Sequence, residues 1–172
     1  YVMSDLTMTK CARYYDKHLT ITSGDGGPYT LTRGDDFGQI QDNARRTYNP
    51  ALIEVDGTAK NKSSLTLTNI VLDDAGRKVG SYFVQADSNG DGHTTVDGSE
   101  VPNTNIVQDA MIATYNGVGT ITLGNGAVLK NYGGMSAVRL ASGVLVMEEG
   151  SQIIDDTTIT REKGKTGSFG PG

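Results

Sequence analysis

Short runs in which every second residue is hydrophobic recur along the chain, and Gly, Asn and Asp separate them. Leu123 and Leu145 lie 22 residues apart, and Leu129 and Ile153 lie 24 residues apart, so the pattern returns after a nearly constant step. An earlier copy occupies residues 51–76. Because a unit of three short strands buries its apolar face only by stacking on the next unit, this repetition predicts a solenoid.

Alternation of apolar and polar residues predicts β-strands, since successive side chains of a strand point to opposite faces. Stacked rounds would place Leu65, Ile121 and Leu145 one above another in an interior column. Parallel strands need long connections, which the rest of each round supplies, and such crossovers are right-handed by default. We therefore predict an all-β chain, folded as a right-handed parallel β-helix with three short strands per coil.

The first round is expected to contain strands around Leu6, Leu19 and Leu31, with the polar and aromatic residues 12–18 between the first two. Leu6 and Met8 would point inward, and Thr7 and Thr9 would point outward. This assignment makes the Leu6 strand the first of the three strands in that coil.

Two segments interrupt the repeat. Residues 33–50 lack a clear period and predict a lid loop on the flank of the solenoid, with room for a helical turn over 41–46. Residues 87–105 are polar and predict an insertion. We expect one β-helix domain over 1–160 and a linker or incomplete coil over 161–172.

Composition limits the possible partners. The 172 residues carry a net charge of −5 with no basic run, which argues against nucleic acid and against an anionic membrane surface. No apolar stretch approaches the roughly 20 residues of a membrane helix, and the single Cys excludes an internal disulfide. The chain opens at Tyr1 inside the pattern, so we expect a mature chain or an excised piece.

One loop has the spacing of a calcium site. Asp87, Asn89 and Asp91 alternate with small residues, as in the first half of an EF-hand loop, where side-chain oxygens surround a hard cation. The later EF-hand Glu is missing, so Asp97 and Glu100 would have to substitute for it. Either calcium orders this insertion, or the segment is a hairpin whose Asp and Asn side chains cap their own backbone.

Adjacent carboxylates suggest a second kind of chemistry. A polysaccharide hydrolase uses two acids on one flank, one as acid and one as base, and a lyase would need a base such as Arg45, Arg46 or Arg139. Neighbouring residues of a strand point to opposite faces, however, which favours solvated turns. The pairs are Asp35 with Asp36, Asp73 with Asp74, Glu148 with Glu149, and Asp155 with Asp156.

Threonines recur in pairs one residue apart. Aligned on a flat face, they would form an array that orders water and binds ice or a mineral; otherwise they reflect the preference of Thr for exposed strand positions. Because the pairs fall on different strands, the sequence does not require a shared face. The pairs are Thr7 with Thr9, Thr20 with Thr22, Thr30 with Thr32, Thr66 with Thr68, and Thr120 with Thr122.

Cysteine and the aromatic residues give two smaller expectations. Apolar neighbours favour a buried, inert Cys11 over a reactive thiol. The aromatic residues either form a sugar-stacking platform or cover the edge of the core, and the second interpretation is preferred. These residues are Phe37, Tyr48, Tyr14, Tyr15 and Tyr115.

Residues 19–37, 51–76 and 119–153 carry a family resemblance, with runs such as LTITSGDGGPYTLTRGDDF and GTITLGNGAVLKNYGG. They resemble the right-handed parallel β-helix (pectate-lyase-like) regions of large surface proteins from Gram-positive bacteria. The resemblance implies a secreted, adhesin-like protein of several domains, attached to the cell wall through parts that this chain does not contain. It implies contact with neighbouring domains of a longer chain and with a host glycan or surface protein.

Three functions follow from these expectations. The leading one is a non-catalytic stalk or binding module, without nucleic acid and without membrane insertion. The first alternative is a polysaccharide lyase or glycoside hydrolase, because similar scaffolds carry such enzymes and a fold does not fix a function. The second alternative is an ice- or mineral-binding Thr array.

Overall fold

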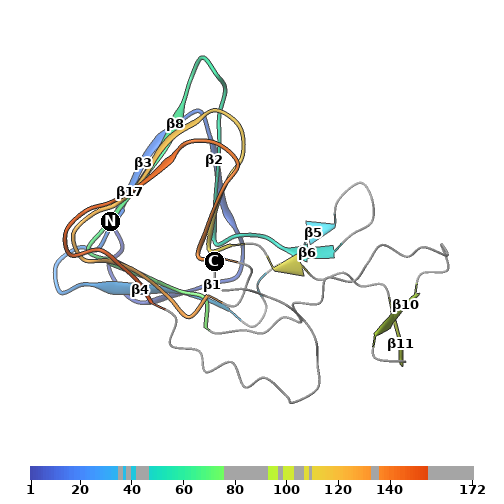
Figure 1. Ribbon diagram of the computed structural model, residues 1–172. Coiled ribbons are helices and arrows are strands. Elements are labelled where there is room, and N and C mark those ends of the chain that lie inside the picture. Colours follow the sequence, from blue (N-terminus) through green and yellow to red (C-terminus); the bar gives the residue numbers. More distant parts are fainter. Residues whose placement is uncertain are drawn as a thin grey trace.

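The computed structural model describes residues 1–34, 37, 40–41, 47–75, 93–96, 99–102, 107–108, 110–132 and 136–154. All regular elements in these residues are β-strands, which confirms the prediction of an all-β chain for this part of the sequence. In the same residues, no helix has the length and apolar character needed to cross a membrane. Thirteen strands form three parallel sheets that enclose a triangular interior (Figure 1).

We name the three sheets I, II and III in the order in which the chain visits them from β2 onward. Sheet I contains β2 (Ala12–Tyr15), β7 (Ile53–Asp56), β13 (Ile112–Thr114) and β16 (Val138–Leu140). Sheet II contains β3 (His18–Thr22), β8 (Ser63–Thr68), β14 (Val118–Leu123) and β17 (Val144–Met147). Sheet III contains β1 (Leu6–Met8), β4 (Tyr29–Arg33), β9 (Ile70–Asp73), β15 (Ala127–Lys130) and β18 (Gln152–Ile154).

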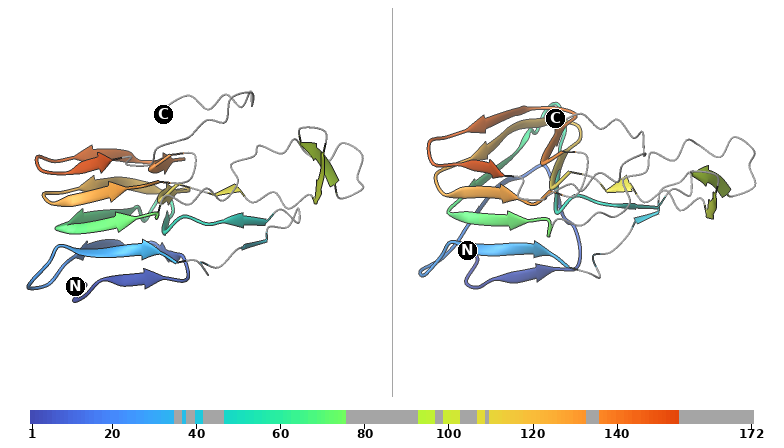
Figure 2. Two further views of the ribbon diagram at one scale, coloured as in Figure 1. Left: turned by 90° about the horizontal axis from the view of Figure 1, so that it is seen from below. Right: turned by 60° about the horizontal axis from the view of Figure 1, so that its bottom comes forward.

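Each turn of the chain adds one strand to each sheet, and we call such a set of three a rung. The described residues form four rungs, which begin at β2, β7, β13 and β16, and β1 precedes them. The rungs are stacked one on another (Figure 2). Three strands per rung and parallel pairing in all three sheets are consistent with the predicted parallel β-helix.

The predicted interior column is confirmed in sheet II. Leu65 is paired with Ile121, and Ile121 with Leu145, while Leu19 extends the column on the other side of Leu65. The prediction that Leu123 and Leu145 occupy equivalent positions of successive rounds, 22 residues apart, was wrong. The register pairs Leu123 with Met147, so the step is 24 residues in sheet II, as it is between Leu129 and Ile153 in sheet III.

The expected order of strands in the first round was also wrong. β1 lies in the same sheet as β4, with Leu6 paired to Leu31, so it belongs to the rung before β2. The third strand of the first coil is β2, which the sequence analysis did not predict. It lies within residues 12–18, which were expected only to connect two strands. Sheet III therefore has the longest column, which consists of Leu6, Leu31, Leu72, Leu129 and Ile153.

The core lies between the three sheets and is densest in the two middle rungs. Apolar residues there are fully buried because each has a neighbouring rung above and below. Removal of apolar surface from water at about 25 cal/mol per Å² supplies the main stabilisation of such a stack. The fully buried side chains of these rungs include Ile53, Leu65, Leu67, Ile70, Leu72, Ile112, Ile121, Leu123 and Leu129.

Both excursions from the repeat leave at the corner where sheet III leads into sheet I (Figure 1). The predicted lid contains β5 (Ile40–Gln41) and β6 (Thr47–Asn49), which pair antiparallel. Gln41 is therefore in a strand, and the rest of the expected helical turn lies outside the described residues. β12 (Val107–Gln108), which follows the predicted insertion, pairs parallel with β6 and so joins the small sheet of the lid.

Candidate binding surface

The predicted calcium ligands are placed only in small part. Glu100 lies in β11 (Ser99–Pro102), which forms an antiparallel hairpin with β10 (His93–Val96). Asp87, Asn89, Asp91 and Asp97 lie outside the described residues. No group of three or more His, Cys, Asp or Glu suited to a metal ion occurs within the described part of the chain. Calcium binding by this loop stays a prediction.

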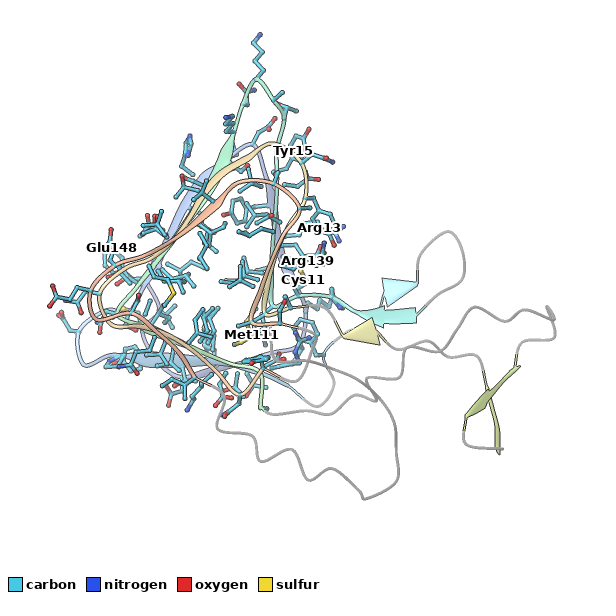
Figure 3. The ribbon with its side chains drawn as sticks, in the orientation of Figure 1. Cys11, Arg13, Tyr15, Met111, Arg139 and Glu148 are labelled. Carbon is cyan, nitrogen blue, oxygen red and sulfur yellow. The ribbon has the colours of Figure 1, made fainter. Side chains whose placement is uncertain are left out.

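The two acidic pairs that the structure describes, Asp73 with Asp74 and Glu148 with Glu149, lie at different corners of the coil. Asp73 forms an ion pair with Lys130 at 3.2 Å, whereas Asp74 is buried with Arg33. Glu148 and Glu149 are exposed in the turn after β17, at the corner between sheets II and III (Figure 3). Asp35, Asp36, Asp155 and Asp156 lie outside the described residues, as do Arg45 and Arg46. The enzyme hypothesis stays untested.

The outer face of sheet II brings three of the five threonine pairs together. Thr20, Thr66 and Thr122 are directly paired across three strands, and Thr22 is paired with Thr68. The neighbouring column consists of His18, Ser64, Thr120 and Val144. Adjacent strands are about 4.8 Å apart, so these side chains form a regular face of hydroxyl and methyl groups.

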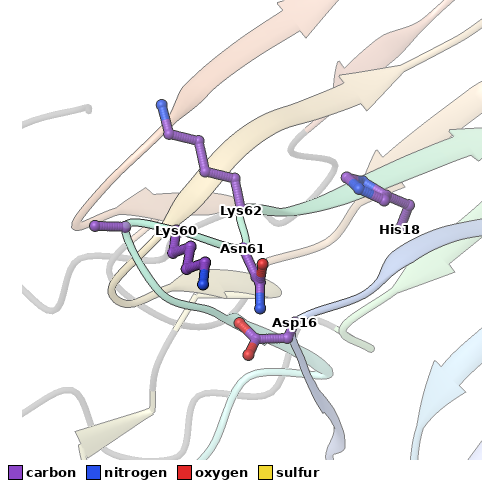
Figure 4. Close-up of a pocket in the computed structure, with 6 residues that line it drawn as sticks. Asp16, His18, Lys60, Asn61 and Lys62 are labelled. Atoms are coloured by element: carbon purple, nitrogen blue, oxygen red, sulfur yellow. The ribbon is translucent and has the colours of Figure 1, made fainter.

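A pocket of about 500 Å³ lies next to this face, at the corner where sheet I leads into sheet II (Figure 4). It is open to solvent, and most of its lining is polar. The loop between β7 and β8 contributes most of the lining, and the turn before β3 and the first residue of β3 contribute the rest. The lining residues are Asp16, His18, Ala59, Lys60, Asn61 and Lys62.

Hydrogen bonds between two rungs and within the loop before β8 hold the backbone of this pocket in place. The Asp16 carboxylate accepts a hydrogen bond from the Thr58 amide at 3.0 Å, and the Thr58 hydroxyl accepts one from the Asn61 amide at 2.9 Å. The Ser63 hydroxyl accepts from the Lys17 amide at 3.1 Å and donates to the Asp56 carbonyl at 2.6 Å. The pocket is therefore formed before any ligand arrives.

Glycine makes the close approach of the rungs possible here. Gly117 has a φ of 58°, and a Cβ at this position would lie 2.3 Å from the Thr58 nitrogen. Its carbonyl accepts a hydrogen bond from the Ser63 amide at 3.0 Å, and the Gly57 amide donates to the neighbouring Asn116 carbonyl at 2.8 Å. No other residue fits this backbone without a shift of the loop.

The aromatic residues do not assemble into a platform in the described part of the chain. Tyr14 points inward, with its hydroxyl donating to the Ser64 carbonyl at 2.9 Å, and Phe37 is buried under the Arg33 guanidinium. These two cover the edge of the core, as preferred from the sequence. Tyr115 stacks with Arg139, while Tyr15 is exposed on the outside of sheet I (Figure 3).

Cys11 packs against the core near Leu52 and Met111, at the start of sheet I. Burial, assisted by the negative charge of Glu54, raises the pKa of the Cys11 thiol to about 12. The thiolate is the reactive form of Cys, so this environment suits an unreactive thiol. The structure therefore shows Cys11 half-buried rather than fully buried, and its lack of reactivity stays a prediction.

Sequence reasoning missed the corner pocket, although a signal for it exists. Lys60 and Lys62 flank Asn61 in a turn of a chain with net negative charge. Their neighbours in space, Asp16 and His18, come from the preceding rung.

Comparisons with protein-family models, with curated protein sequences and with solved structures find no match to this chain. The candidate site therefore has to be interpreted from its own geometry.

Proposed function

We propose that this chain is a length of right-handed parallel β-helix that serves as a non-catalytic module of an extracellular bacterial surface protein. In this role it gives reach to the protein and presents one flank to a host glycan or surface protein. Attachment to the cell wall would come from other parts of a longer chain. Calcium bound by the insertion would order that segment without taking part in a reaction.

The observation that supports this proposal is the exposure of apolar core residues at the two ends of the stack. Residues of the core columns are exposed there: Leu6 is 51% exposed at one end, and Met147 is 48% and Ile153 37% exposed at the other. A parallel edge strand beside an apolar column can be covered by a further strand in the same register. These ends therefore suit continuation into further rungs or neighbouring domains, as a stalk requires.

An array of neutral glycans, acidic glycans and host surface proteins, probed with the labelled chain, tests the binding role. We expect selective retention on a subset of the array, and no release of reducing or unsaturated sugar ends from polysaccharides incubated with the chain. Release of such ends would instead support the enzyme alternative. Absence of both retention and release would contradict the binding role.

A second candidate is favoured by one specific observation. The direct pairing of Thr20, Thr66 and Thr122 gives the regular spacing that an ice- or mineral-binding face needs. The column ends at Val146, and His18 and Lys62 lie at its margin. Thermal hysteresis of the freezing point, lost in Thr66→Tyr, would support this candidate, and its absence would remove it.

A further inference from the structure

We infer that the corner pocket binds the acidic group of an anionic glycan, a sulfate or a carboxylate, while the sugar lies along the hydroxyl face of sheet II. This inference rests on the proposed function and names the ligand class and the place of binding. It uses three features of the pocket: its charge, its fixed backbone and its continuity with the Ser and Thr columns.

The charge of the pocket is opposite to that of the chain as a whole. The chain carries a net charge of −5, yet two lysines, Lys60 and Lys62, line this pocket. Within the described residues, neither lysine forms an ion pair. An ammonium group acts as a point charge for a sulfate or carboxylate, so the pocket has cationic donors available for an anion.

Asp16 offsets one of the two lysine charges, so the pocket keeps a positive excess. Its carboxylate is engaged by the Thr58 amide at 3.0 Å, which fixes it against the backbone of the loop that carries the lysines. Its role is therefore to position that loop. Because the loop is already held by the bonds of Thr58 and Asn61, little ordering entropy is lost when a ligand binds.

The pocket continues directly onto the face of sheet II. His18 lines the pocket and also stands first in the column of Ser64 and Thr120, with its Nδ1 2.8 Å from the Ser64 Oγ. A Cβ atom built on Gly119 would lie 3.7 Å from the Lys62 Cβ and 3.8 Å from its Cδ. The aliphatic part of the Lys62 side chain therefore lies beside Gly119 in β14. Hydroxyl groups both donate and accept hydrogen bonds, and a row of them beside cationic groups suits an acidic sugar.

The test measures affinity by titration calorimetry with three probes: a sulfated heparin oligosaccharide, a carboxylated oligogalacturonate and neutral maltohexaose. Lys60→Gln/Lys62→Gln is compared with Lys10→Gln/Lys130→Gln, which makes the same change in net charge away from the pocket. We expect the wild type to bind at least one acidic probe and not the neutral one. The pocket variant should lose about tenfold or more in affinity, and the control should change less than about twofold.

Several outcomes would overturn the inference. One is an equal loss in the two variants, and another is equal affinity for a single-stranded oligonucleotide, because either would show unspecific attraction of polyanions. Matching thermal unfolding curves for the two variants would show that both are folded. If the acidic probes fail while the array retains a neutral glycan or a host protein, this inference falls and the proposed function stands. If nothing binds in either experiment, both fall.

Discussion

The guanidinium of Arg33 forms a buried ion pair with the carboxylate of Asp74, 41 residues away in the sequence. Arg33 is the last residue of β4, where the lid departs, and Asp74 follows β9, where the insertion departs. Arg33 Nη1 also donates to the carbonyl of Pro50 at 2.9 Å, where the lid returns. One side chain therefore holds together three of the points at which the two excursions join the stacked rungs.

This arrangement predicts a large loss of stability when the pair is broken. Arg33 is 2% exposed, so Arg33→Met removes one partner of a buried ion pair, at a cost of about 3–5 kcal/mol. The matched control is Lys130→Met, because the Lys130–Asp73 pair is partly exposed and surface pairs are worth about 0–1 kcal/mol. Urea unfolding measures both, and equal effects would contradict the anchoring role.

The interior column predicts a cost for Ile121→Ala. Ile121 is fully buried between Leu65 and Leu145, so the substitution removes apolar contacts and leaves a cavity. We expect the free energy of unfolding to fall by about 2–5 kcal/mol. The adjacent Thr122→Ala points outward and should change it by less than about 1 kcal/mol. A cost near zero for Ile121→Ala would place this residue outside the core.

The backbone at Gly117 predicts a contrast with a nearby glycine. Gly117→Ala meets both a positive φ and a contact of 2.3 Å with the Thr58 nitrogen, so it should cost about 1–3 kcal/mol or more. Gly119→Ala meets nothing closer than 3.7 Å and should be tolerated. Thermal and urea unfolding of the two variants compares them directly, and equal stability would show that the two rungs do not approach at this corner.

The raised pKa of Cys11 predicts slow reaction with thiol reagents and a loss of stability at alkaline pH. The unfolded thiol ionises near 9.0 and the folded thiol near 12, so the unfolded chain loses its proton first as the pH rises. The contribution of Cys11 is complete below 9 and declines between 9 and 12. Cys11→Ala should therefore lose less stability over this interval than the wild type. Fast labelling of the native protein at neutral pH would contradict this environment.

The insertion predicts calcium-dependent stability. If Asp87, Asn89 and Asp91 bind the ion with Asp97 or Glu100, a concentration one hundred times the Kd stabilises the bound state by about 2.7 kcal/mol. Calorimetry should show heat with calcium, and chelation should lower the melting temperature. Asp87→Asn/Asp91→Asn should abolish both effects. If the wild type gives no heat with calcium and no change in melting temperature with a chelator, the calcium prediction is wrong and the hairpin interpretation stands.

Hydrophobic alternation was sufficient to predict the columns of sheet II. Leu65, Ile121 and Leu145 are large apolar residues, and a second one follows each of them two positions later, so the alternation can be recognised from the sequence alone. β2 was missed because its inward residues, Ala12 and Tyr14, are a small residue and a polar aromatic one. They are accommodated beside Ile53 and Val55 of the next rung, a context that only the stack provides.

The corner pocket and the Arg33 pair were beyond prediction for a related reason. Each depends on residues from two rungs, and the connections at the corners differ in length from one round to the next. Asp16 and Asn61 line one pocket because the loop after β7 is fixed against the turn after β2. The register between strands of neighbouring rungs determines which residues come into contact at the corners. The sequence of one rung alone does not contain this register.

The stacking of rungs is the central claim, and a distance across one rung tests it most directly. Nitroxide labels at Thr20→Cys and Thr122→Cys, in a Cys11→Ser background, would occupy one column with Thr66 between them. The account predicts backbones about 10 Å apart, with strong dipolar broadening of the spin-resonance spectrum, and weaker broadening for a control pair at Thr20 and Val128 on different sheets. Equal, weak broadening in both pairs would contradict the stack and favour strands paired as antiparallel hairpins.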